Sequence, residues 1–203
     1  MARIKDDLLY EQRREQILLA AATVFSKKGF HAARTEEICA AAGMSPGTLF
    51  RHFKDKDAII AAVAAAGVQE YVADIEEMLS PSGIKFIQKM SARELKLLLA
   101  PSKFELSIES WIELYRNPDL RSVAVEADLR VRNAFIASFK EAKRMKLVRA
   151  DLNPTSAAAI MIALFTGLAA EAEFGSTSNT AQSERLLARG LSDLLQHYLQ
   201  PPA

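Results

Sequence analysis

Residues 47 to 51 bring together side chains that suit contact with a polyanion. Gly47 has no side chain, so the backbone there can approach a ligand closely. Thr48 offers a hydroxyl and a methyl, which suit a phosphate or a thymine methyl. Arg51 can donate two hydrogen bonds to guanine O6 and N7, or it can hold a phosphate. These residue types, this close together, favour a surface that contacts duplex DNA.

Two short helices joined by a tight turn are predicted to position these side chains. Thr35 is expected to cap a first helix that ends near Ala42. The turn Gly43-Met44-Ser45 follows, and Pro46 stands first in a second, shorter helix that Ser45 caps. Such a pair is the helix-turn-helix unit, whose second helix enters the major groove. Because helical hairpins are common, a three-helix core that only packs is the alternative.

The whole chain is predicted to be all-α. Helix breakers separate segments with helical periodicity, and no segment alternates apolar and polar residues as a strand does. The expected core of the first three helices consists of Ile17, Phe25, Ile38, Leu49 and Phe53. The expected helices are Tyr10–Lys28, Thr35–Ala42, Pro46–His52, Asp55–Leu79, Ile84–Leu99, Ser102–Arg116, Asp119–Leu147, Thr155–Phe174 and Thr180–Gln200.

Composition indicates an ordinary globular protein and excludes several classes of function. Half of the 203 residues are apolar, a quarter are charged, and the net charge of +1 points to no particular partner. Cys39 is the single cysteine, which excludes an internal disulfide and a zinc site built on thiolates. The start is charged, and the longest apolar stretch, 157–170, is shorter than a membrane span. We therefore expect a cytoplasmic protein with no membrane segment.

The order of residues from 13 to 60 resembles the TetR (tetracycline-repressor-like) family of bacterial regulators. The matching residues are Ile17, Ala20, Ala21, Phe25, Gly29, Arg34, Thr35, Ile38 and the run Ala-Gly-Met-Ser-Pro-Gly-Thr-Leu-Phe-Arg-His-Phe-Lys-Asp-Lys over 42–56. The resemblance implies a helix-turn-helix DNA-binding domain over residues 1–56. It also implies a helical effector-binding and dimerisation domain over 57–203. Beyond residue 80 the likeness is one of helix layout, not of motif.

The resemblance assigns DNA contact to residues of both short helices. Thr35, His52 and Lys56 match family positions that contact phosphates. The expected DNA-binding residues are Arg34, Thr35, Ser45, Pro46, Gly47, Thr48, Phe50, Arg51, His52, Lys54 and Lys56. The family usually has tyrosine where this chain has Phe50, so a hydroxyl is lost while the ring can still meet a thymine methyl. Arg34 is hypothesised to supply a compensating phosphate contact.

The C-terminal half carries the expected dimer and effector sites. The resemblance implies that two helices pair with their copies, through Ile160, Leu164, Leu187, Leu191, Leu194 and Tyr198. A candidate effector lining consists of Phe86, Met90, Phe104, Ile108, Trp111, Tyr115, Phe135, Phe139 and Phe165, although an aromatic stripe is also typical of plain core. Glu105, Glu109 and Glu113 share one face, which indicates solvent or, if it points inward, a cationic effector.

The expected function is repression. A homodimer would bind a palindromic operator and a small-molecule effector would release it. The alternative is a helix-turn-helix dimer that recruits a protein partner and has no effector. The three histidines lie far apart and no Ser-His-Asp, HExxH or phosphate-loop pattern is present, so the chain is not expected to be an enzyme or to need a metal or cofactor.

Overall fold

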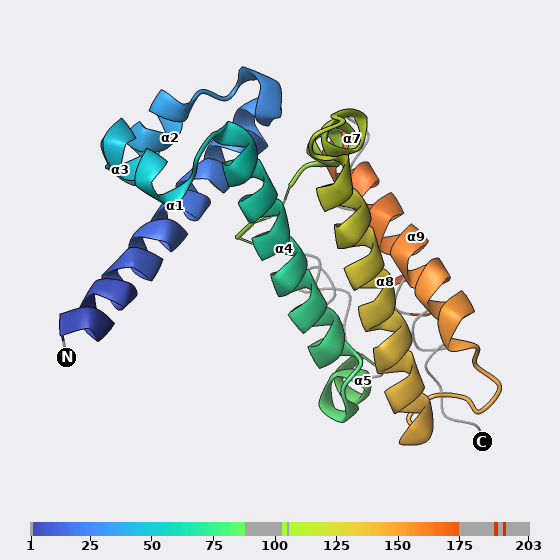
Figure 1. Cartoon of the computed structure of the whole chain (residues 1–203). Helices are drawn as coiled ribbons and strands as arrows, with labels where there is room; N and C mark the ends of the chain where they lie inside the picture. The colour runs from blue at the N-terminus through green and yellow to red at the C-terminus, as the bar shows by residue number, and fades with distance from the viewer. Residues whose placement is uncertain (1, 88–102, 105, 175–188, 191–192, 194–203) are drawn as a thin grey trace. The chain divides into compact units, whose positions relative to one another are not determined.

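A computed structural model of the chain describes residues 2–87, 103–104, 106–174, 189–190 and 193. Within these residues every regular element is an α-helix, which confirms the all-helical prediction (Figure 1). The chain divides into two compact units: the first comprises Met1–Glu70 with Ser102–Asp128, and the second Tyr71–Pro101 with Leu129–Ala203. The expected functional boundary between residues 56 and 57 stays a prediction.

Helix α1 (Ala2–Ala32) is longer than predicted at both ends. It begins at Ala2 instead of Tyr10, because no glycine or proline interrupts the residues before Tyr10. Gly29 adopts a φ of 69° and a ψ of 172°, a backbone conformation that L side chains rarely adopt. The helix is kinked at this glycine, so its regular part ends at Lys28 as predicted, and one further helical turn to Ala32 follows the kink.

Helices α2 (Thr35–Ala42) and α3 (Pro46–His52) form the predicted pair. Arg34, and not Thr35, is the N-cap of α2, because its extended backbone N–H donates to the Glu37 carboxylate over 3.1 Å. The prediction for α3 is confirmed: Gly43 makes the left-handed turn, and the Ser45 hydroxyl accepts the Thr48 N–H over 3.2 Å.

The expected core of the first unit is confirmed. Ile17, Phe25, Ile38, Leu49 and Phe53 are all buried there. Phe30, after the kink, packs edge-on against the Phe25 ring at a centroid distance of 5.0 Å. The two short helices are therefore held against α1 by apolar contacts (Figure 1).

Helix α4 (Lys56–Met78) lies within the predicted range Asp55–Leu79, and the Asp55 carboxylate caps its start by accepting the Ala58 N–H over 2.8 Å. This helix is long and apolar enough to cross a membrane by length and composition alone. Its residues Ile59, Ile60 and Val63 are buried in the core of the first unit, as in the core helix of a globular protein.

The later helices within the described residues are α5 (Pro81–Ile87), α7 (Ile108–Arg116), α8 (Arg121–Arg144) and α9 (Pro154–Phe174). Among them, α7 and α8 are shorter than predicted, α5 begins three residues earlier than predicted, and α9 matches its prediction to within one residue. Helix α7 begins at Ile108 and not near Ser102, because the Ser107 hydroxyl accepts the Ser110 N–H over 3.0 Å and caps the helix there. The predicted helix over 180–200 lies outside the described residues.

The core of the second unit centres on three phenylalanine rings. Phe135 stacks on Phe139 and on Phe165, with a centroid distance of 6.3 Å in both pairs. Helix α9 contributes Ala157 and Met161 to this core. Ile160 of the same helix is 44% exposed within the described residues.

The two faces of α3 give a direct test of this packing. Leu49 is 0% exposed and Phe50 is 47% exposed. We expect Leu49→Ala to lower the free energy of unfolding by about 2–5 kcal/mol, because it leaves a cavity in the core. Phe50→Ala should change it by less than about 0.5 kcal/mol. Urea unfolding followed by circular dichroism measures both, and equal losses would contradict the orientation of α3.

Candidate nucleic-acid interface

One face of α3 points to solvent. Gly47, Phe50 and Arg51 are exposed and lie at positions i, i+3 and i+4, while Leu49 faces the core. A Cβ on Gly47 would meet only the Ser45 hydroxyl, at an ordinary 3.9 Å, so packing within the protein does not require glycine there. The bare position instead suits close approach by an external partner. The exposed face thus carries the side chains expected to read DNA.

The hydroxyls at the start of α3 are paired with each other. Ser45 and Thr48 hydroxyl oxygens lie 3.0 Å apart, and the Ser45 oxygen also accepts the Thr48 N–H. Pro46 is exposed at the first helical position. Ser45 therefore fixes where the helix begins, and it holds the Thr48 hydroxyl at that end of the helix.

His52, at the end of α3, is covered by a residue that sequence reasoning missed. The Tyr10 ring of α1 lies over the imidazole, with centroids 4.3 Å apart and planes 31° apart. The imidazole Nδ1 is buried without a hydrogen-bond partner. Burial lowers the pKa of His52 from its ordinary value, and the neighbouring Arg51 and Arg14 lower it further. Tyr10 and His52 are 42 positions apart in the chain, so no local sequence pattern indicates their contact.

A second contact joins α1 to the end of α3. The Arg14 guanidinium lies 5.3 Å from the centroid of the Phe53 ring. The Gln16 amide donates to the Ala42 carbonyl over 3.2 Å. The part of α1 that precedes Ile17 therefore supports both short helices.

At the start of α2, Arg34 is exposed and the Glu37 carboxylate accepts hydrogen bonds from Lys28 and from the Arg34 N–H. The Thr35 hydroxyl donates to the Glu36 carboxylate over a long 3.5 Å. A hydrogen bond from Lys28 is the main cause that lowers the pKa of Glu37, followed by the bond from the Arg34 backbone. Phosphate contact by Arg34 and Thr35 stays a prediction.

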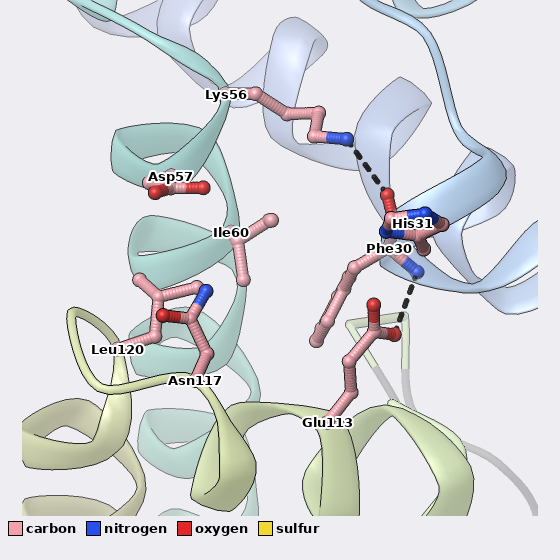
Figure 2. A pocket seen from close by; sticks show the side chains of 8 residues that line it. All are labelled: Phe30, His31, Lys56, Asp57, Ile60, Glu113, Asn117 and Leu120. Atoms are coloured by element: carbon pink, nitrogen blue, oxygen red, sulfur yellow. Dashed lines mark hydrogen bonds between the residues drawn. The ribbon is translucent and has the colours of Figure 1, made fainter.

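The two lysines expected to contact DNA differ in environment. Lys54 is exposed, with its ammonium 3.6 Å from the Asp55 carboxylate. Lys56 is half-buried, and its ammonium donates to the Phe30 carbonyl over 2.9 Å (Figure 2) and to the Ala33 carbonyl over 3.2 Å. These bonds hold the loop before α2, so a phosphate contact by Lys56 would compete with them.

Three supported helices that expose Gly47, Phe50 and Arg51 define a helix-turn-helix DNA-binding domain. The model of bacterial regulatory proteins of the tetR family matches residues 17–63. The model of the C-terminal domain of BetI-type transcriptional repressors matches residues 99–196. The chain belongs to the TetR family of bacterial transcriptional regulators, as the sequence motif predicts.

Similar proteins cover nearly the whole chain. The HTH-type transcriptional regulator UidR of Escherichia coli strain K12 is 28% identical over 161 residues, which are 79% of this chain and 81% of UidR. A TetR-family regulator from Mesorhizobium loti has the same fold, with a TM-score of 0.71 and 22% identity over 94% of this chain and 96% of that one. FadR of Bacillus subtilis, solved with stearoyl-CoA, has a TM-score of 0.65 and 17% identity over 93% and 99%.

The expected effector lining is distributed over both units. Phe104, Ile108, Trp111 and Tyr115 belong to the first unit, and Phe86, Phe135, Phe139 and Phe165 belong to the second. Of these, Phe86 and Tyr115 are exposed, and Phe104 is part of the first unit's core. Met90 lies outside the described residues. Phe135, Phe139 and Phe165 are brought together, and the lining as a whole stays a prediction.

Tyr71 joins these three rings and was not among the expected lining residues. Its ring meets Phe135 edge-on at 6.4 Å. Burial raises the pKa of the Tyr71 phenol to about 12, and Asp74 adds to that effect. The helical period of α4 indicates that Tyr71 faces the core. It does not indicate which residues of α8 and α9 lie next to Tyr71.

Arg51 and Lys54 are expected to act differently on DNA. Arg51→Ala should weaken binding to a duplex selected from a random pool by about 5- to 150-fold, equivalent to about 1–3 kcal/mol, and relax the base preference at one position. Lys54→Ala should weaken binding to all duplexes by the same factor and reduce the magnitude of the slope of log K against log salt by about one. Fluorescence anisotropy over a salt series measures both. An unchanged base preference in Arg51→Ala would show that Arg51 holds only a phosphate.

The cover over His52 predicts a pH effect. Because the folded protein holds the His52 proton less tightly than the unfolded chain, protonation below pH about 6.5 favours unfolding, and stability falls as the pH falls. Tyr10→Ala should raise the pKa of His52 toward its ordinary value and weaken this dependence, while Tyr10→Phe keeps the ring contact and serves as the control. NMR titration of the imidazole C–H resonance measures the pKa. A wild-type pKa at or above 6.5 would contradict the burial of the ring.

Proposed function

We propose that this chain is a repressor that binds a palindromic operator as a homodimer in the cytoplasm and is released by a small-molecule effector. The exposed face of α3, with Arg51 beside Phe50 and a bare Gly47, is the observation that carries the proposal. A dimer seated on an operator blocks transcription sterically. The match to BetI-type repressors over residues 99–196 supports repression over activation.

Two considerations support the dimer. A single short helix contacts few base pairs, so helix-turn-helix proteins bind two half-sites about 34–36 Å apart as two-fold pairs. Residues 1–57 hold ten basic and eight acidic side chains, a surplus of only two positive charges. Non-specific attraction to DNA is therefore weak, and a second DNA-binding domain, from a partner copy, is needed for tight binding to the operator.

Helix α9 offers a surface for the partner copy. Ile160 is exposed, as are the small residues Ala163 and Gly167 further along the same helix. Small residues allow another helix to approach closely. Leu164 is half-buried against the second unit's core, and the remaining expected interface residues, Leu187, Leu191, Leu194 and Tyr198, lie outside the described residues.

Support for an effector comes from the second unit and from the fold. The Phe135, Phe139 and Phe165 rings, with the Tyr71 phenol beside Phe135, form a largely buried apolar cluster with one polar group, and small-molecule sites are lined by residues of these types. The FadR structure shows that this fold can hold an acyl-CoA. Effector binding by this chain rests on these two arguments.

The proposal is tested with a dimer-breaking variant. Ile160→Glu places a charge on the exposed apolar side of α9, and Thr155→Glu adds the same charge at an exposed position on a different side of the helix. Sedimentation should give a dimer for wild type and Thr155→Glu, and a monomer for Ile160→Glu.

Each protein is then used to capture sheared genomic DNA from the source organism. Wild type and Thr155→Glu should enrich a short palindrome, and Ile160→Glu should not. Capture by the monomer at wild-type affinity, or enrichment of sites without two-fold symmetry, would contradict the proposal.

A further inference from the structure

The peptide groups on both sides of Phe30 are held from outside their own helix. The left-handed φ of Gly29 interrupts the regular path of α1 at this point. The Phe30 N–H donates to the Glu113 carboxylate of α7 over 3.2 Å. The Phe30 carbonyl accepts from the Lys56 ammonium over 2.9 Å. Figure 2 shows the two contacts on opposite sides of the Phe30 backbone.

These contacts connect three helices of the first unit. The Phe30 side chain is buried in the core beside Phe25, so the α1 end cannot move without disturbing the packing of the helix-turn-helix. Lys56 is the first residue of α4, and its second bond reaches Ala33, just before α2. Glu113 is thus the point where α7 contacts a backbone segment that leads directly into α2.

The carboxylate lies at the edge of a small cavity and not in close packing. A cavity of about 130 Å³ separates the end of α1 from α7 and the start of α4, and Asp57, Ile60, Asn117 and Leu120 complete its lining (Figure 2). Glu113 is half-buried, so its side chain has room to leave Phe30. A charged acceptor bonded to a backbone N–H beside free space can exist in two discrete arrangements, bonded and released.

We infer that Glu113 is a positioning residue that couples α7 to the DNA-binding helices through the Phe30 peptide group. The inference rests on the proposed function, since it concerns how α7 senses DNA bound at α3. Coupling between two sites is reciprocal, so DNA binding must alter the surroundings of α7. Trp111 reports this, because it lies on α7, packs against the first unit's core and is the one tryptophan of the chain.

Three variants distinguish the effect of losing the Glu113–Phe30 hydrogen bond from a general loss of stability. Glu113→Leu removes the acceptor at similar bulk. Glu113→Gln keeps an amide oxygen that can accept the Phe30 N–H. Glu109→Leu removes an exposed carboxylate from the same helix and is the matched control. Thermal unfolding of all three establishes that each is folded.

Amide exchange tests the hydrogen bond in the free protein. We expect the Phe30 amide to exchange about tenfold faster in Glu113→Leu than in wild type, and to stay within about threefold in Glu113→Gln and Glu109→Leu. NMR detection resolves the single amide. An unchanged Phe30 rate in Glu113→Leu would overturn the assigned contact.

Trp111 fluorescence during titration with the captured duplex tests the coupling. Wild type, Glu113→Gln and Glu109→Leu should show the same DNA-dependent change. Glu113→Leu should still bind the duplex, as anisotropy of labelled DNA reports, but lose most of the Trp111 change. A full Trp111 response in Glu113→Leu, or none in wild type bound to DNA, overturns the inference. Failure of wild type to bind any duplex instead contradicts the proposed function, and it also contradicts the coupling, which requires DNA binding at α3.

Discussion

The burial of Leu49 and Phe53 against α1 and α2 is the constraint on which the DNA interface depends. Helix α3 has only seven residues, and a helix of this length has little stability of its own in water. Its conformation and direction are therefore set by the buried side chains of Leu49, within the helix, and Phe53, directly after it, and by the Ser45 cap. Because Leu49 faces inward, the helical period turns Gly47, Phe50 and Arg51 outward together. The exposed face of α3 is thus a consequence of the core.

The surroundings of α3 extend this support in two directions. The N-terminal part of α1 covers the end of α3, through Tyr10 on His52 and Arg14 on Phe53. The C-terminal end of α1 is held by Lys56 and Glu113 at Phe30. The first helix therefore contacts the recognition helix at one end and α7 at the other. A change at α7 has a short physical path to the DNA-binding helices.

Local features of the fold were predictable because their causes lie within a few residues. The Gly43 turn, the Ser45 cap, Pro46 at the first helical position and the Asp55 cap follow from residue type and spacing. The N-cap of α2 was misplaced by one residue because the capping contact comes from the Arg34 backbone, which every residue type shares. The start of α7 was misplaced because Ser102 and Ser107 are equivalent caps in the sequence alone. The contacts of Tyr10 with His52 and of Glu113 with Phe30 join residues far apart in the chain, so no local pattern could indicate them.

The central claim is that α3 reads the major groove, and guanine N7 is exposed only there. Dimethyl sulfate footprinting on the captured duplex tests this directly, because the reagent methylates guanine N7. The account predicts protected guanines in two half-sites related by a two-fold axis and spaced by about one helical turn. It also predicts that Arg51→Ala loses the protection of one guanine in each half-site. A bound duplex whose guanine N7 atoms all stay reactive would contradict the account.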